Sequence, residues 1–415
     1  MDLAGLVARL DGRLAHADAD LAARYPGARP GRQPVHTLYV PAHHYDAGSV
    51  ARYGRAAEQA VVEHEELFLE LIGNDEDLLQ RVRAKLETEP VEDLRIDFED
   101  GYGDRGDAAE DEAVAASVKA LREDLASGVA PPSFGIRFKS LERPTRERGI
   151  RTLVSFVEGV AGDGTVPTGF VVTLPKVTSV AQVEAMAYVC ADVERGLGLA
   201  DHSLEFELQV ETPQAIVGPD GSVLVAPMIH AADGRCAGLH YGTYDYSASI
   251  GIAAAHQNLD HPSADVAKTL IQVAAAGTGV RLSDGSTNIL PVGSQADVRR
   301  GWDTHLRLVR RSLRRGYYQG WDLHPHQLPT RYAATFAFFR EGLDGATARL
   351  AAWAARESGS VADEPATVKA LAGFLVRGVE CGALTEGEAT GTSGHDLGAL
   401  VDLARPRPPP NSFRR

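Results

Sequence analysis

The chain lacks any run of roughly 18 apolar residues, the length that a helix needs to cross a bilayer. Its first residues, Met1-Asp2-Leu3-Ala4, do not join a basic segment to a long apolar one, so we expect no secretion signal. Cysteine is scarce, and Cys190, Cys236 and Cys381 lie far apart without CxxC spacing. These absences argue against a disulfide framework or a zinc–thiolate site, and we expect a cytoplasmic protein.

Positive charge is also in short supply. The 415 residues hold 42 Lys and Arg against 57 Asp and Glu, a net charge of −15. This balance disfavours binding to nucleic acid or to an anionic membrane surface, because both need local positive charge. The apolar share of 44% and the charged share of 24% are ordinary for a globular protein, and the length allows one large domain or two smaller ones.

What the sequence does contain is a repeated alternation of short β-rich runs with Ala-rich helical stretches. Several runs are almost continuously apolar, as in residues 169–174, which is typical of strands buried on both faces. Eight alternating units predict a (β/α)₈ barrel, with an open doubly wound sheet as the alternative. The eight runs are His36–Ala42, Leu94–Asp100, Phe134–Leu141, Gly169–Val177, Leu204–Glu211, Ala237–Tyr246, Val280–Val292 and Gly320–His324.

The alternation stops near Glu341, and this sets the predicted domain organisation. We expect an N-terminal helix and linker over residues 1–33 and the catalytic barrel over 34–340. A helical appendage over 341–404 and a Pro-rich, disordered tail over 405–415 are expected to follow.

In a (β/α)₈ barrel the active site lies at the carboxyl ends of the strands. Those ends are rich in carboxylates, and Glu211 and Asp245 are predicted to lie at the ends of neighbouring strands. Crowded carboxylates repel one another unless a cation lies between them, and Mg²⁺ is a hard ion that takes one or two protein carboxylates. Glu211 and Asp245 are therefore candidate metal ligands; the alternatives are a helix cap or a lysine pair.

Two cationic side chains at the strand ends leave alternatives open. Arg137 either points inward, to bind a substrate carboxylate or an oxyanion, or forms a structural salt bridge with Glu99 or Asp97. Lys176 could form a Schiff base, which would give metal-free aldol chemistry, although an ion pair with neighbouring acids is favoured.

Other motifs carry less information. His43-His44 and His324-Pro325-His326 could suggest zinc, but no HExxH spacing supports it, and capping or core hydrogen bonding is favoured. The basic helix expected over Val298–Arg315 is interpreted as a solvated face or a subunit contact, with a phosphate site as a weaker alternative. P-loop, dinucleotide and GxSxG patterns do not occur.

Six segments in order resemble the HpcH/HpaI aldolase and citrate lyase beta-subunit family. They cover roughly residues 35–340; each match is weak alone and the ordered set is strong. The segments are Ile96-Asp97-Phe98-Glu99-Asp100, Ile136-Arg137-Phe138, Leu174-Pro175-Lys176-Val177, Val210-Glu211-Thr212, residues 242–251 (GTYDYSASIG) and residues 320–327 (GWDLHPHQ).

This resemblance implies a barrel of the phosphoenolpyruvate/pyruvate type, with Mg²⁺ or Mn²⁺ on Glu211 and Asp245. It implies that Arg137 binds substrate carboxylate or enolate oxygen, and that the protein is a homo-oligomer, a trimer or hexamer. The chain departs from the family pattern in three ways: it is longer, residues 101–112 differ from the family's shorter segment, and His43-His44 stand where small residues are expected. These departures leave the identity of the substrate and the use of CoA open.

We therefore expect a Mg²⁺-dependent carbon–carbon lyase or aldolase that cleaves or forms a 3-hydroxy acid, or its CoA thioester, through an enolate. Asp100 is the expected base, with Glu99 or a water on the metal as alternatives. The expected substrate contacts are Arg137, Asp97, Lys176, Thr212 and Pro213. The rival hypotheses are a malate-synthase-like condensing enzyme, a CoA-independent pyruvate aldolase, and a catalytically idle barrel that binds a metabolite.

Overall fold

The computed structural model describes residues 2–162, 164–355 and 364–405. At its centre, all the strands of the described chain pair in parallel, in the order β7-β6-β5-β4-β3-β2-β1-β8. The edge strands meet through a parallel bridge between Ser283 and Gln319, which closes the sheet. The predicted (β/α)₈ barrel is confirmed over the open sheet. The strands are β1 (His36–Pro41), β2 (Asp93–Asp97), β3 (Ser133–Arg137), β4 (Phe170–Leu174), β5 (Glu205–Val210), β6 (Cys236–Tyr241), β7 (Arg281–Ser283) and β8 (Gly320–Asp322).

Each of the eight predicted runs contains one strand, but all eight strands end earlier than predicted. The run predicted to end at Asp100 leaves the sheet at Asp97, and the run predicted to end at Tyr246 leaves it at Tyr241. Polar residues at the carboxyl ends turn the chain away from the sheet and carry the candidate site. Asp245 consequently lies in a helix that follows β6, and not on the strand itself.

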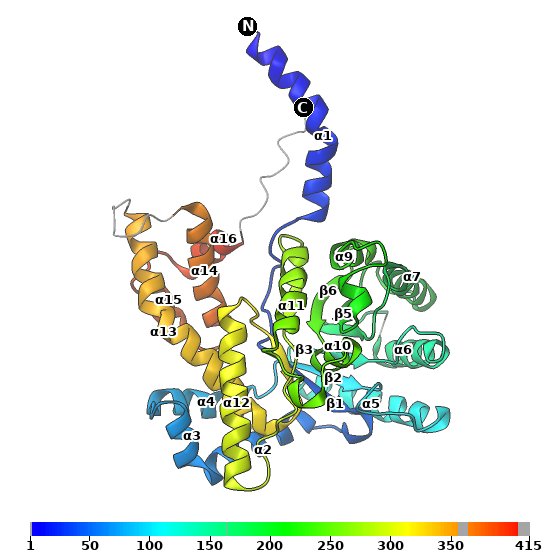
Figure 1. Cartoon of the computed structure of the whole chain (residues 1–415), viewed down its shortest axis with the longest axis vertical. Coiled ribbons are helices and arrows are strands. Elements are labelled where there is room, and N and C mark those ends of the chain that lie inside the picture. The colour runs from blue at the N-terminus through cyan, green and yellow to red at the C-terminus, as the bar shows by residue number, and fades with distance from the viewer. Residues whose placement is uncertain (1, 163, 356–363, 406–415) are drawn as a thin grey trace.

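Helices surround the barrel, as Figure 1 shows. They cover the apolar outer face of the sheet, where side chains such as Leu38, Ile136 and Leu208 are fully buried. None of the described helices is long and apolar enough to span a bilayer. The helices are α1 (Leu3–Arg24), α2 (Ser49–Glu63), α3 (Glu65–Leu71), α4 (Glu76–Thr88), α5 (Asp107–Ser127), α6 (Arg146–Val160), α7 (Val180–Leu197), α8 (Pro213–Ile216), α9 (Val225–Ala231), α10 (Thr243–Ser249), α11 (Pro262–Ala275), α12 (Gln295–Arg314), α13 (Leu328–Ala354), α14 (Pro365–Glu380), α15 (Glu386–Thr390) and α16 (Leu397–Ala404).

The N-terminal helix and the C-terminal helical group are present at the ends of the chain. The boundary predicted at residue 340 falls inside α13, which begins beside the barrel and continues against α14. Of the predicted disordered tail, Arg405 forms an ion pair with Glu380 at 2.9 Å. Residues 406–415 lie outside the described residues, and the division into domains stays a prediction.

The inside of the barrel is polar, whereas such barrels are commonly filled with branched apolar side chains. Arg95 pairs with Asp93 and, at 2.9 Å, with Glu207. His240 Nε2 lies 3.1 Å from the other oxygen of Glu207, while Trp321 Nε1 donates to His240 Nδ1 at 2.7 Å. Burial raises the pKa of Glu207, but Arg95 and His240 outweigh it and hold the pKa well below the usual range. Every charge in this chain of contacts therefore has a partner, as buried charges require.

The basic helix α12 uses its arginines within the chain. Most of them form ion pairs with acidic residues of neighbouring segments. These pairs neutralise much of the positive charge that the sequence analysis assigned to a solvated face, a subunit contact or a phosphate site. The pairs are Arg299–Glu70, Arg307–Asp260, Arg310–Glu341, Arg311–Asp265 and Arg315–Asp265.

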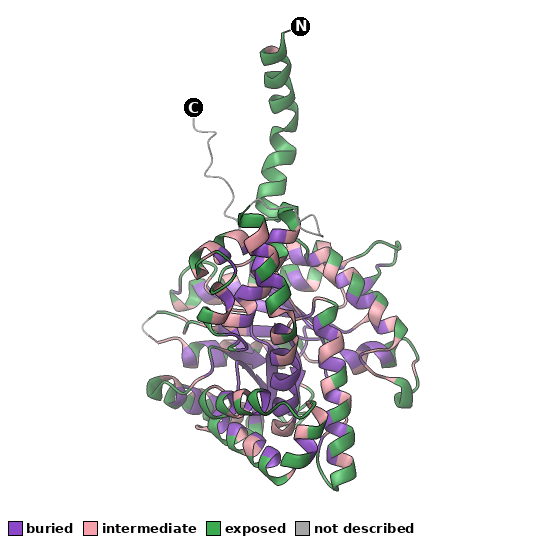
Figure 2. Cartoon of the chain, turned by 90° about the vertical axis from the view of Figure 1, so that its left-hand side faces the viewer, coloured by how far each residue is buried: buried purple, intermediate pink, exposed green. Residues whose placement is uncertain are grey.

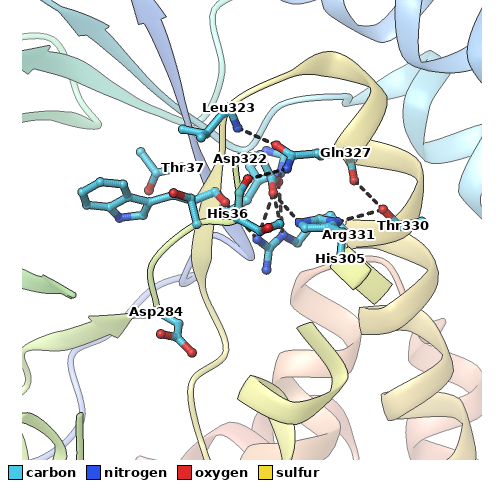
Figure 3. Close-up of polar contacts among 12 residues, drawn as sticks. His36, Thr37, Asp284, His305, Asp322, Leu323, Gln327, Thr330 and Arg331 are labelled. Carbon is cyan, nitrogen blue, oxygen red and sulfur yellow. Dashed lines mark hydrogen bonds and ion pairs between the residues drawn. The ribbon is translucent and has the colours of Figure 1, made fainter. Parts of the chain in front are cut away.

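A second buried polar network joins β8 to the helical layer (Figure 3). Asp322 is fully buried and contacts His36 Nδ1 and His305 Nε2, each at 3.0 Å. Arg331 of α13 donates to the same carboxylate, at 2.9 Å from Nη2 to Oδ1, and Thr330 holds the other nitrogen of His305 at 2.8 Å. Burial raises the pKa of Asp322, but Arg331 and the two histidines outweigh it and lower the pKa well below its usual range.

Replacing Asp322 should therefore destabilise the fold strongly. In Asp322→Ala, Arg331 stays buried without its carboxylate, and we expect a loss of about 3–5 kcal/mol in the free energy of unfolding at pH 7. Because the folded pKa of Asp322 is depressed, this contribution is present above about pH 4 and is lost as the pH falls further. Urea unfolding at several pH values measures it. Asp303→Asn, on an exposed position of α12, is the control and should change stability little; equal stability of the two variants would contradict the expectation.

Candidate active site

The carboxyl ends of six neighbouring strands, β1 to β6, contribute to one cluster of polar and charged side chains at this end of the barrel. Tyr39 lies on β1, Asp97 ends β2 and Arg137 ends β3. Lys176 follows β4, and Glu211 comes directly after β5. Glu99 and Asp100 lie in the turn after β2, and Asp245 lies in the first turn of α10. The predicted catalytic and metal-binding residues are thus brought together.

Arg137 points into the barrel and is held there by Asp97. Its Nε and Nη2 atoms donate to the two oxygens of Asp97 at 2.7 and 2.6 Å. The guanidinium lies over the ring of Tyr39, with 4.9 Å from Cζ to the ring centroid. Its remaining nitrogen, Nη1, is 3.4 Å from Glu99. The salt bridge with Asp97 that the sequence left open is therefore present, and it fixes the inward orientation of Arg137. Binding of a substrate carboxylate or oxyanion by Arg137 stays a prediction.

Asp97 has no free acceptor position in this arrangement. Besides Arg137, its oxygens accept the backbone N–H groups of Glu99 at 2.9 Å and Gly101 at 2.8 Å. These four bonds make Asp97 a positioning residue for Arg137 and for the turn that carries Glu99. A direct substrate contact by Asp97 stays a prediction.

Lys176 lies among the acids of the mouth. Its ammonium donates to Glu99 at 2.6 Å and Asp100 at 2.8 Å, and lies 4.0 Å from Asp245. Burial lowers the pKa of Lys176, but the charges of Glu99 and Glu211 and the bonds to Asp100 and Glu99 outweigh burial and raise it. A lysine held protonated is a poor nucleophile, so the ion-pair interpretation is favoured over a Schiff base.

The two acids beside Lys176 differ in their surroundings. Glu99 is largely buried, and burial raises its pKa despite Arg137 and Lys176. The side chain of Asp100 is 54% exposed. Burial raises the pKa of Asp100 as well, but the hydrogen bond from Lys176 outweighs it and lowers the pKa. Both remain candidates for the base, and Asp100 is the more accessible to a substrate.

Glu211 is the most deeply buried acid of the cluster, with 1% of its surface exposed. Burial and the nearby charge of Asp245 raise its pKa to about 8, although Lys176 and Arg137 partly offset them. Lys176 N–H donates to Glu211 Oε1 at 2.8 Å. Gln209, with its amide oriented to satisfy both neighbours, donates to Glu211 Oε1 at 3.2 Å and accepts from Arg137 Nη1 at 3.3 Å.

The donor set fits a divalent cation. Five carboxylates (Asp97, Glu99, Asp100, Glu211, Asp245) lie around two cationic side chains, Arg137 and Lys176, which leaves an excess of negative charge. Burial raises the pKa of Glu211, and the charge of Asp245 raises it further. Among the described residues no cluster of three or more His, Cys, Asp or Glu side chains has metal-binding geometry. Mg²⁺ usually takes one or two protein carboxylates and completes its shell with water and substrate, so the pair Glu211 and Asp245 suffices.

Thr212 and Pro213 have local structural roles. Thr212 Oγ1 accepts from Ala215 N at 3.2 Å, which caps α8, and donates to the carbonyl oxygen of Val177 at 2.6 Å. Pro213 is the first residue of α8, where its missing N–H is not needed. These contacts fix the loop that follows Glu211, and substrate binding by Thr212 and Pro213 stays a prediction.

The histidines behave as helix caps and surface contacts. His324 caps a short 3₁₀ helix by accepting from His326 N at 3.2 Å, as expected for capping. His43 Nε2 lies 3.0 Å from Arg105, in the segment where the chain departs from the family pattern. The ring of Tyr102 also packs against His43, so these contacts join the segment after β1 to the segment after β2.

Three residues of the site were given no role by the sequence analysis. Tyr39 lies two positions before the end of β1 and Gln209 lies one position before the end of β5. Both point into the barrel by alternation, so the inward-facing positions near each strand end would have revealed them. Gly242 carries no chemical signal. An added Cβ there would lie 2.3 Å from Glu211 Cβ and 2.4 Å from Oε2, so only glycine leaves room for the buried carboxylate.

Comparison with known proteins places this site in context. The family described as "Domain of unknown function (DUF6986)" matches residues 14–408. The chain belongs to that family. A curated relative, the L-malyl-CoA/beta-methylmalyl-CoA lyase of Haloarcula marismortui, is 32% identical over 158 residues. That match covers 37% of this chain and 41% of the relative, so the chain aligns with less than half of the relative's length.

Solved structures share the fold of this DUF6986 protein. A citrate lyase from Burkholderia xenovorans LB400 superimposes with a TM-score of 0.59 at 18% identity, over 87% of this chain and 96% of that chain. Malate synthase of Haloferax volcanii gives 0.51 at 14% identity, over 74% and 76%. At these identities the likeness concerns the fold, and it confirms the citrate-lyase-like barrel that the ordered segments indicated.

The space opposite Gly242 gives a test of the carboxylate site. Gly242→Ala should displace Glu211 and weaken Mn²⁺ binding by about tenfold or more, the effect typical of disturbing a ligand's support. The backbone φ of −93° allows alanine, so the fold should persist. Electron paramagnetic resonance of free Mn²⁺ during titration measures the affinity. Gly196→Ala, on a helix with open space around it, is the matched control; unchanged affinity in Gly242→Ala would contradict the assignment of Glu211.

Proposed function

We propose that this protein is a divalent-metal-dependent carbon–carbon lyase or aldolase acting on a 3-hydroxy acid or its CoA thioester. The observation that carries the proposal is the placement of Arg137 inside the mouth, next to the buried acid Glu211 and its neighbour Asp245. A fixed cation beside a carboxylate metal site is suited to an oxyanion that develops as a carbon–carbon bond breaks.

The comparisons support the same class of reaction. The curated relative is named as a malyl-CoA lyase, and both solved structures that share the fold are named for reactions at carbon–carbon bonds of small carboxylic acids. The aligned part covers less than half of that relative, so the substrate and the use of CoA are proposals for this chain. The malate-synthase likeness supports the reverse, condensing direction as the second candidate function.

Glu211 and Asp245 would hold Mg²⁺ or Mn²⁺, and the ion would supply Lewis acidity and orient the substrate. Arg137 Nη1 is the one nitrogen of its guanidinium that Asp97 does not occupy, so it is the donor available to a substrate oxygen. Asp97, Tyr39 and Gln209 keep that donor in place before substrate arrives, which lowers the cost of orienting it.

In the cleavage direction, a carboxylate of the mouth takes the proton of the substrate hydroxyl. The C–O bond becomes a carbonyl, the adjacent carbon–carbon bond breaks, and its electron pair forms an enolate that Arg137 stabilises. Protonation of the enolate at carbon completes the reaction. Asp100 is the proposed base and Glu99 the alternative, and Lys176 donates to both and keeps them near the substrate.

The proposal extends to the setting of the enzyme. We infer that it works as a homo-oligomer in the cytoplasm, on a small carboxylic acid, without a nucleic-acid or membrane partner. The alternative of a catalytically inactive barrel would be favoured by an Arg137 side chain that points out of the barrel. Arg137 instead points inward and is held there by two hydrogen bonds to Asp97, which argues against this alternative.

A substrate panel tests the activity. The panel contains 3-hydroxy acids and 2-oxo acids with aldehydes, each free and as CoA thioesters, with acetyl-CoA plus glyoxylate for the condensing direction. We expect turnover with Mg²⁺, loss of turnover with EDTA, and recovery on added Mg²⁺. Glu211→Ala and Asp245→Ala should each lose at least about 10²-fold in kcat. Asp220→Asn, in an exposed loop, is the control; full activity of both alanine variants in excess EDTA would exclude the mechanism.

Arg137 can be tested without removing its charge. Arg137→Lys keeps a cation but loses the planar fork that binds Asp97 and a substrate oxygen together. We expect kcat to fall by about 10²-fold or more with a smaller change in KM. Arg151→Lys, at an exposed ion pair of α6, is the matched control and should behave as wild type. A rise in KM with unchanged kcat would show that Arg137 binds the substrate and the transition state equally, and would contradict its role in stabilising the enolate.

A further inference from the structure

Helix α1 projects from the body of the protein, and none of the helices or strands that the structure describes covers it, as both Figure 1 and Figure 2 show. No residue from Leu3 to Arg24 is buried. Its large apolar side chains are open to solvent: Leu3 is 68% exposed, Leu14 51% and Leu21 61%. The helix leaves the body at a fixed point, because Gly27 N donates to Gly277 O at 2.9 Å just after it.

One set of apolar residues in α1 follows a regular pattern. Its members are separated alternately by four and three residues, and they are Leu3, Val7, Leu10, Leu14, Ala17 and Leu21. Leu6 is the one further large aliphatic residue of the helix, and it lies beside Val7 at the edge of this set. This repeat of 3.5 residues is the pattern of the a and d positions in a left-handed coiled coil, and it differs from the wider stripe of a helix that packs on a globular core. Gly5 and Gly12 both fall on the opposite, outer face of the helix.

A helix of this length and composition is marginal by itself. Isolated helices gain little stability in water, and two glycines weaken this one further. Its exposed apolar seam also favours burial against another helix. We propose that α1 pairs with α1 of a second copy of this chain in a parallel, in-register, two-stranded coiled coil.

The charges beside the seam favour a second copy in the parallel orientation. Position g of one heptad holds Arg13, and position e of the next heptad holds Asp18. In a parallel pair these positions face each other across the seam, so Arg13 of each chain meets Asp18 of the other. An antiparallel pair would instead bring the two e positions together, and these hold Asp11 and Asp18, which repel. This inference does not depend on the proposed activity.

Site-directed crosslinking tests orientation and register. Val7→Cys and Leu21→Cys lie on the seam near opposite ends of α1, so each can crosslink to the same residue of another chain only when the helices are parallel and in register. The three native cysteines are buried and should not compete. We expect both variants to form disulfide-linked dimers under mild oxidation, at least tenfold faster than Ala19→Cys on the outer face.

Two outcomes of the crosslinking would overturn the proposal. One is crosslinking at the seam no faster than at Ala19→Cys. The other is crosslinking only in a mixture of Val7→Cys and Leu21→Cys chains, which would show antiparallel pairing. The proposal would also be overturned if sedimentation equilibrium found the wild-type chain to be a monomer at micromolar concentration.

A charge exchange tests the partner chemistry independently. Arg13→Asp should weaken the pairing of α1 by roughly threefold to tenfold, because two attractive contacts become repulsive. Arg13→Asp combined with Asp18→Arg should restore it, since the opposite charges face each other again. Seam crosslinking of Val7→Cys in each background reads the pairing directly. Failure of the double exchange to restore crosslinking, with α1 still helical by circular dichroism, would show that another partner covers the seam.

Discussion

The fork between Asp97 and Arg137 is the contact on which the candidate site depends. It joins the carboxyl ends of β2 and β3 inside the mouth and leaves a single guanidinium nitrogen for other partners. Gln209 then links that nitrogen to Glu211, so the cation of one strand end and the buried acid of another are held by one set of hydrogen bonds. These groups are therefore ordered in the folded protein before substrate binds, so little free energy is needed to orient them for the reaction.

The polar interior of the barrel gives that fork its support. Below the mouth, Arg95, Glu207, His240 and Trp321 form a continuous chain of contacts between strands that an apolar filling would not provide. Breaking one member would leave a buried charge without a partner, which costs more than losing an apolar contact of similar size. The polar interior therefore fixes the relative positions of the strands that carry the site. As a consequence, we expect substitutions of these interior residues to be strongly destabilising.

The number of strands follows from the sequence, because apolar runs are local patterns, whereas every strand ends before its predicted run does. All eight runs contain a strand, and Glu99, Asp100, Arg137, Lys176 and Glu211 lie at the mouth as expected. Asp245 could not be placed in this way, because α10 begins at Thr243 directly after the strand. The ion pairs of α12 were missed for another reason: their acids come from segments far along the chain, which a local pattern cannot reveal.

Lys176 shows how local strain and site electrostatics are combined. It is one of the few residues other than glycine with positive φ, at 51°, a conformation that costs roughly 1–2 kcal/mol for an ordinary side chain. That conformation accompanies the bond from its N–H to Glu211, while its ammonium contacts Glu99 and Asp100. One residue therefore supplies a backbone donor to Glu211 and a side-chain cation to Glu99 and Asp100. Because that ammonium lies 4.0 Å from Asp245, a divalent cation on Asp245 and Glu211 would repel it towards Glu99 and Asp100, so metal binding and the charge state of the proposed base are electrostatically linked.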